Sequence, residues 1–228
     1  FFKRYILDKV SKFNEFSIPG DFYPDSTKNF YSSIGFSDYL AIDLNTKMDS
    51  IIMDLNKNFS KDYKFDKQFD LVTNIGTGEH IFDQKIVFEN MHNLTKVGGI
   101  ILNILPFYMS LNHGFFNFHP VLFRDLAYAN NYDWCFLWIG DCFGKFKEFS
   151  TNGDVFKEIK RARPFSLRET FRRPYSNLEK FIYSYRSHRG HDYIISAYQK
   201  TSDSEFSIPI QGKWIHNIDK EKAKGVIL

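Results

Sequence analysis

The sequence has little cysteine and no long apolar segment. Its 228 residues include only Cys135 and Cys142, which are too few for a disulfide framework and match no zinc-binding spacing. We therefore expect free thiols in a reducing compartment, in keeping with a cytoplasmic protein. No apolar run reaches the ~18 residues that a membrane-spanning helix needs, and no signal peptide is recognisable. These features argue against a secreted disulfide scaffold and against a membrane-spanning protein.

The sequence also lacks a strong excess of charge of one sign. The formal net charge is +3, which by itself is too small to indicate a nucleic-acid partner. The charge is unevenly distributed, because residues 155–192 contain ten Lys and Arg against four Asp and Glu, a local charge of +6. This basic segment predicts either a contact with an anion or a solvated surface element.

The apolar pattern predicts strands that alternate with helices. Helical spacing, capping residues and glycine or proline stops predict helices at residues 2–13, 25–34, from Asp83 to Gly98-Gly99, and from His119-Pro120 to Asn130-Asn131. Short apolar runs predict strands at residues 39–43, 51–54, 69–76, 100–105 (stopped by Pro106), 134–139 and 193–198. This order is typical of an α/β fold with a doubly wound, mostly parallel sheet that helices cover on both faces.

The first two predicted strands each close on an acid. Ligands of such sheets bind at the carboxyl ends of the strands, and a carboxylate there can accept hydrogen bonds from both hydroxyls of a ribose. Asp43 is placed for that role, and Asp54 with Leu55 can pair with an adenine amino group and pack against its ring. For both acids, capping of the loop that follows is the alternative interpretation.

The segment FDLVTNIGTGEHIF, residues 69–82, is the strongest local signal. Gly76 and Gly78 allow the backbone to approach a ligand closely, and Glu79 and His80 follow at the predicted carboxyl edge. The alternative is a helix start that Thr77 or Glu79 caps, with His80 in the wall.

The pattern between residues 36 and 140 resembles the class I S-adenosylmethionine-dependent methyltransferases. The resemblance is carried by FDLVTNIGTGEHIFD, by FENMHNLTKVGGIILNILP and by the helix and strand after HGFFNFHP, with residues 193–200 as the last strand. It is closest to a bacterial subgroup with a short link between the two acids. It implies a Rossmann-like domain formed by residues 1–142 and 193–228, and a basic helical or irregular insertion or cap at residues 143–192.

The resemblance also implies a cofactor and a set of site residues. The cofactor would be S-adenosylmethionine, and the acceptor a small molecule, with a phosphate or carboxylate if the arginines of the insertion contact it. The cofactor-binding residues would be Asp43, Leu44, Asp54, Leu55, Asn74, Ile75, Gly76 and Thr77. The catalytic candidates are His80, His113 and Glu79, because an imidazole can take a proton near neutral pH.

Several alternatives remain open for these residues. His113 and His119 can serve loop structure instead of catalysis, and Phe115, Phe116 and Phe118 can line an acceptor pocket or belong to the core. The histidines are far apart in sequence and lack i, i+4 pairing, so we expect no metal site from Glu79, His80, His113 and His119.

One motif of the family is missing from the sequence. The Gly-rich loop that normally follows the first strand is not found, and we expect the chain to begin at the helix after it, with Pro19-Gly20-Asp21 as a substitute loop in the alternative case. The basic segment also allows an RNA-binding or RNA-modifying protein, and the missing loop allows a non-catalytic relic of the fold.

Overall fold

The computed structural model describes residues 27–45, 50–108, 113–140, 146–148 and 192–211. The chain divides into two compact units, residues 1–63 and 64–228, which are described separately. The predicted helix at residues 2–13 lies outside the described residues, as does almost all of the predicted insertion at 143–192. The expectation of a single domain with an insertion therefore stays a prediction.

The first unit contains two short helices and two short parallel strands: α2 (Thr27–Ser33), β1 (Ile42–Asp43), β2 (Ile51–Ile52) and α3 (Phe59–Tyr63). Gly35 follows α2 with φ +98°, as the sequence predicts for a residue just beyond a helix end. The strands are much shorter than expected, and α3 was not predicted. Its five residues are too few to show a helical period; Asn58 instead marks its start, by accepting a hydrogen bond from the Lys61 amide.

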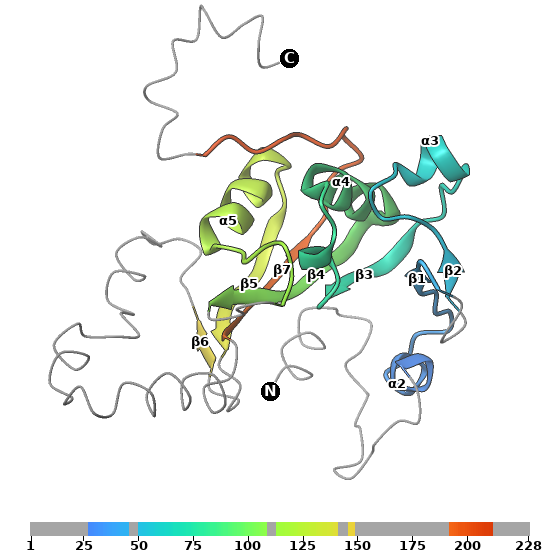
Figure 1. Ribbon diagram of the computed structural model, residues 1–228, viewed down its shortest axis with the longest axis horizontal. Helices are drawn as coiled ribbons and strands as arrows, with labels where there is room; N and C mark the ends of the chain where they lie inside the picture. The colour runs from blue at the N-terminus through green and yellow to red at the C-terminus, as the bar shows by residue number, and fades with distance from the viewer. Residues whose placement is uncertain (1–26, 46–49, 109–112, 141–145, 149–191, 212–228) are drawn as a thin grey trace, which may run out of the picture. The chain divides into compact units, whose positions relative to one another are not determined.

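The second unit is built on a five-stranded sheet in the order β3-β4-β7-β5-β6 (Figure 1). Its strands are β3 (Phe69–Ile75), β4 (Thr95–Tyr108), β5 (Asp133–Gly140), β6 (Phe146–Glu148) and β7 (Asp192–Gln199). β3 and β4 are parallel, whereas β7 is antiparallel to both β4 and β5, and β6 is antiparallel to β5.

The sheet therefore corrects the expectation of mostly parallel pairing. β3, β4 and β5 run in one direction, but the last strand enters between β4 and β5 in the opposite direction. Apolar runs reveal that a strand is buried and not which way it runs. β6 was also unexpected, because residues 143–190 showed no strand pattern.

Helices α4 (Gln84–Leu94) and α5 (Pro120–Ala129) pack on the same face of this sheet (Figure 1). Their apolar side chains and those of β4, β5 and β7 form one core cluster, with Phe123 and Leu105 completely buried. Leu137 belongs to this cluster, so Phe136 and Trp138 point to the opposite face, where their rings stack 4.2 Å apart. The described helices of this unit thus cover one face, and the predicted coverage of the other face stays a prediction.

The start of α4 matches the sequence, but its end does not. Asp83 caps the helix by accepting a hydrogen bond from the Ile86 amide at 3.1 Å. The helix ends at Leu94, where the Thr95 hydroxyl donates to the Met91 carbonyl at 2.7 Å, and not at Gly98-Gly99. Strand β4 begins at once, at Thr95, and its pairing with β3 is irregular between Thr95 and Ile100, where Gly98 has φ +81°.

Pro106 does not end β4 as expected, since it pairs with Tyr193 of β7 next to a register shift. The predictions for β3, β5, β7 and α5 are confirmed, including the proline in the first turn of α5. No helix among the described residues is long and apolar enough to span a bilayer.

Candidate functional site

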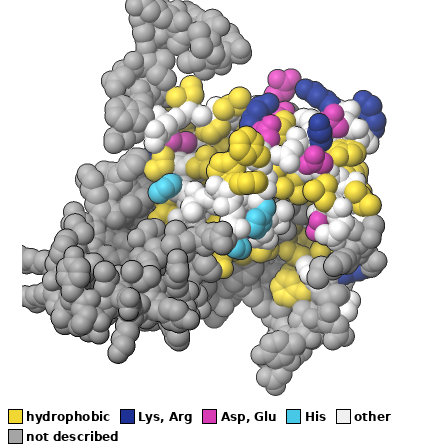
Figure 2. Space-filling model, in the orientation of Figure 1, with side chains coloured by type: hydrophobic (Ala, Val, Ile, Leu, Met, Phe, Trp, Pro, Cys, Tyr) yellow, Lys and Arg dark blue, Asp and Glu magenta, His cyan; other side chains and the backbone are white. Residues whose placement is uncertain are grey.

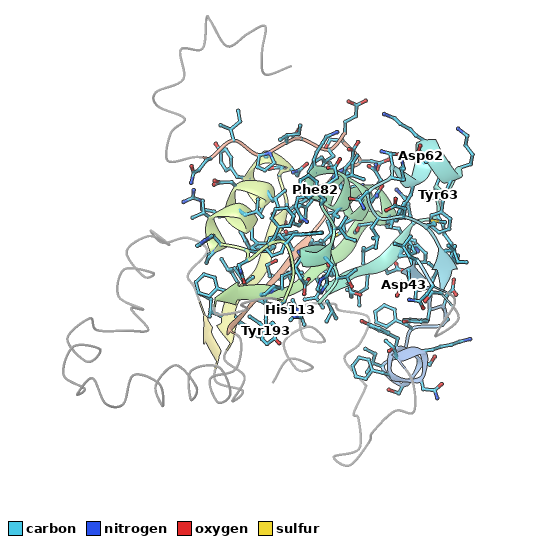
Figure 3. The ribbon with its side chains drawn as sticks, viewed as in Figure 1. Asp43, Asp62, Tyr63, Phe82, His113 and Tyr193 are labelled. Atoms are coloured by element: carbon cyan, nitrogen blue, oxygen red, sulfur yellow. The ribbon has the colours of Figure 1, made fainter. Side chains whose placement is uncertain are left out.

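Three chemically reactive side chains meet at the carboxyl edge of β3 and β4. Glu79 and His80 follow β3, and His113 lies in the connection that leaves β4 (Figure 3). His113 Nε2 is 3.3 Å from Glu79 Oε1, and His80 Nε2 is 3.9 Å from the same oxygen. The two imidazole rings make an edge-to-face contact with centroids 5.0 Å apart. We call these three residues the Glu-His cluster.

The cluster combines a buried acid with two accessible bases. Glu79 is completely buried, and its Oε2 has no hydrogen-bond partner among the described residues. The side chains of His80 and His113 are 46% and 42% exposed, so a ligand can reach both imidazoles. Histidine side chains reach the surface on the face that Figure 2 shows, with hydrophobic side chains nearby.

The Asn74 side chain holds the turn that carries Glu79. Asn74 Oδ1 accepts a hydrogen bond from the Gly78 backbone amide at 2.8 Å, and Asn74 Nδ2 is 3.5 Å from Oδ1 of Asn103 on β4. A Cβ atom at position 78 would lie 2.6 Å from the Asn74 side chain, so this contact requires glycine. Gln84 also donates to the Gly78 carbonyl at 2.7 Å. The short 3₁₀ helix η3 (Gly78–His80) is therefore positioned by side chains of β3 and α4.

The segment that carries His113 is attached directly to Glu79. The Phe115 amide donates to the Glu79 carbonyl at 2.7 Å, and a Cβ atom on Gly114 would lie 2.8 Å from that same oxygen. Glycine at position 114 thus permits the approach that brings His113 beside the Glu79 carboxylate.

The other residues of the glycine-bearing turn have different environments. Gly76 adopts φ +63°, a conformation that favours glycine, and its amide donates to the Ile104 carbonyl. Ile75 is 47% exposed. Thr77 makes no side-chain cap, and Glu79 lies inside η3, so the predicted capping by these two residues is wrong. Asn74 provides the cap instead.

The two predicted acids of the first unit form matching turns. Asp43 Oδ1 accepts from both the backbone and the side-chain nitrogen of Asn45, and Asp54 Oδ1 does the same with Asn56. Hydrogen bonds from the Asn56 backbone, and then from its side chain, lower the pKa of Asp54. Both acids thus cap loops, as the alternative interpretation expected.

Loop capping uses Oδ1 of each acid and does not conflict with a second role in ligand binding. Leu44 is 64% exposed and Leu55 is partly buried. These four residues belong to the first unit and the Glu-His cluster to the second. Their convergence on one ligand therefore stays a prediction.

The remaining candidate residues differ in whether they lie in the hydrophobic core or at the surface. His119 precedes α5 without a side-chain cap, and its ring packs against Phe107. Phe118 is buried in the core, whereas Phe115 is 68% exposed and contacts Phe82, which is 75% exposed.

Sequence reasoning did not single out Phe82, Gly114 or Asn103. For Gly114, the sequence signal that could have indicated a close backbone approach is its position next to His113. The arginines of the basic segment lie outside the described residues, so the RNA-binding alternative stays open.

Comparisons of this chain with family models, with curated proteins and with solved structures find no match.

Proposed function

We propose that this protein is an S-adenosylmethionine-dependent methyltransferase that acts on a small-molecule acceptor. The observation that carries the proposal is the Glu-His cluster, in which a buried carboxylate contacts an accessible imidazole at the carboxyl edge of two parallel strands. Ligands of α/β sheets bind at that edge. The cluster arises from the two segments, GTGEH and NHGFF, that are central to the resemblance.

The arrangement of the sheet supports the same proposal. β3, α4, β4, α5, β5 and β7 occur at the positions that the resemblance assigns to the family's later strands and helices. β1 and β2 also pair in parallel, which places Asp43 at the end of β1, and Asp54 just beyond β2, on one edge of their unit.

Methyl transfer from a sulfonium requires alignment more than covalent help from the protein. S-adenosylmethionine, when bound, would supply the methyl group to the acceptor atom, and its sulfur would leave as a neutral thioether as the carbon–sulfur bond breaks. If the acceptor is a hydroxyl or an amine, its proton must go to a base. His113 suits this role, because a proton on Nε2 is donated to Glu79 Oε1 and leaves Nδ1 as the basic nitrogen.

The neighbourhood of the cluster favours an acceptor with an apolar or aromatic portion. Phe82 and Phe115 form an exposed aromatic pair with ring centroids 6.0 Å apart, and Phe115 is hydrogen-bonded to the backbone of Glu79. Stacking on such rings would hold a flat acceptor near the imidazoles. An anionic group on the acceptor would be bound by the arginines of residues 143–192.

Calorimetric titration of the full-length natural protein with S-adenosylhomocysteine tests the proposal. We expect micromolar binding that Asp43→Asn weakens at least tenfold, because asparagine keeps the Oδ1 acceptor for Asn45 and loses the charge for the ribose. Asp66→Ala, at an exposed acid to which the resemblance gives no role, is the matched control and should bind as the unmodified protein does. Absence of binding by the folded protein would instead favour a non-catalytic relic.

A further inference from the structure

The buried oxygen of Glu79 points to a ligand that the proposed function does not supply. A buried carboxylate is costly unless hydrogen bonds or a positive charge compensate it. Oε1 has His113 as a neighbour, but Oε2 is buried without a partner among the described residues. We propose that Glu79, His80 and His113 bind one divalent transition-metal ion, of the kind represented by Zn²⁺.

The distances within the Glu-His cluster fit a single ion. One ligand atom from each residue lies within 4.8 Å of the other two. Zn²⁺ bonds of about 2.0–2.1 Å in tetrahedral geometry place ligand atoms about 3.4 Å apart. The His113–Glu79 distance of 3.3 Å already matches this value, and the His80–Glu79 distance is 3.9 Å. A small rotation of the exposed imidazoles closes the difference.

The cluster is held in place by contacts that do not involve the ligand atoms. Asn74 and Gln84 hold Gly78, and the Phe115 amide holds the Glu79 carbonyl. The two histidines therefore come from separate segments that are both attached to the same buried acid. This differs from a group of exposed surface acids, because the carboxylate is buried and the ligand set is two imidazoles and one carboxylate.

The donor atoms select the class of metal. Two imidazole nitrogens and one carboxylate oxygen suit Zn²⁺, Fe²⁺, Co²⁺ or Ni²⁺, whereas Mg²⁺ and Ca²⁺ prefer oxygen ligands alone. Three protein ligands leave one or more coordination positions for water or a substrate. The partial exposure of both imidazoles places such a position where solvent reaches it.

This inference does not rest on the proposed methyl transfer, but it changes the role of the histidines in it. With an ion bound, His113 is a ligand and no longer a base. A hydroxyl that coordinates the ion loses its proton more readily than a free one, so the ion would supply the activation that the imidazole otherwise provides.

Metal titration of the full-length protein, stripped with a chelator, tests the inference. Co²⁺ serves as the probe for visible absorption, and Zn²⁺ is added in competition with a chromophoric chelator. We expect one ion at micromolar affinity or tighter, Co²⁺ bands that Zn²⁺ abolishes, and at least a tenfold loss of affinity in Glu79→Gln and His113→Gln. His119→Gln is the matched control, because His119 lies outside the cluster, and it should bind as the unmodified protein does.

Unchanged metal binding in Glu79→Gln and His113→Gln, or no binding by the folded protein, overturns the inference. Near-ultraviolet circular dichroism verifies that each variant is folded. His80→Gln, at an exposed side chain, provides a further variant should Glu79→Gln fail to fold. Binding of S-adenosylhomocysteine without metal binding would reject the metal site and leave the methyltransferase proposal intact. Metal binding without binding of S-adenosylhomocysteine would reject the methyltransferase proposal and leave the metal site intact.

Discussion

At the scale of single residues, glycine determines whether the Glu-His cluster can form. Gly78 and Gly114 lie against Asn74 and Glu79 so closely that a methyl group would overlap with them. Neither has a positive φ, so it is the close approach and not the backbone conformation that requires glycine. Gly98 is the opposite case, with φ +81° and open space around it.

Gly114→Ala is expected to destabilise the protein by about 1–3 kcal/mol and to separate His113 from Glu79, because the new methyl would lie 2.8 Å from the Glu79 carbonyl oxygen. Urea unfolding measures the loss of stability. Gly98→Ala is the comparison, since it adds strain without overlap and should cost only about 1–2 kcal/mol. A Gly114→Ala protein as stable as the original would contradict the packing described for this loop.

A second residue-level prediction concerns His92, which is buried away from the cluster. Its Nε2 must carry the proton, because its partner at 2.7 Å is the Ser204 carbonyl, and Nδ1 then accepts from the Tyr132 hydroxyl at 2.6 Å. Burial raises the pKa of Tyr132, which therefore stays protonated as the donor. Burial of the imidazole is the main cause that lowers the pKa of His92 below its usual 6.5.

The folded state consequently binds fewer protons at His92 than the unfolded state does below about pH 6.5. Stability from the neutral ring is fully present above that pH and is lost as the pH falls toward the lowered pKa. The free energy of unfolding should therefore decrease from pH 7 to pH 5, and the decrease should be smaller in His92→Gln. Equal slopes for the two proteins in denaturant titrations would show that His92 is not the group responsible.

At the scale of elements, α4 links the sheet to the cluster. It begins at Gln84, after the Asp83 cap, and the Gln84 side chain donates a hydrogen bond to the Gly78 carbonyl. Asp83→Ala should destabilise the protein by about 1 kcal/mol, because the Ile86 amide loses its acceptor. Asp83→Asn should cost much less, since asparagine caps a helix start nearly as well. Thermal unfolding distinguishes the two variants, and similar losses would argue against capping.

The elements that the sequence predicts best are those whose signal is local. β3, β5 and β7 are short apolar runs, and α5 begins with a proline that is favourable in a first helical turn. The end of α4 was missed because Thr95 stops the helix with its own side chain before the Gly98-Gly99 signal is reached. The direction of β7 has no local signal, because an apolar run looks the same whichever way the strand runs.

In the candidate site, too, the sequence predicts the features that have a local signal and misses those that depend on distant contacts. The carboxyl-end rule places Glu79 and His113 at one edge from sequence alone, because both follow predicted strands. It could not reveal that Glu79 is buried, or that the two histidines and this acid lie close enough to share one ion. Those facts depend on Gly114 and Asn74, whose contacts come from segments distant in sequence.

At the scale of the whole molecule, the proposal assigns cofactor-binding residues to both units. The acids Asp43 and Asp54 belong to the first unit, and the glycine-bearing turn with the Glu-His cluster belongs to the second. Ligand binding should then protect backbone amides in both units at once.

Hydrogen–deuterium exchange of the full-length protein with and without S-adenosylhomocysteine tests this claim most directly. The account predicts slower exchange, in the presence of the ligand, at residues 42–45 and 52–56 and also at residues 75–80. Protection confined to one unit, or absent from both in a folded protein at millimolar ligand, would contradict the assignment of cofactor-binding residues to both units.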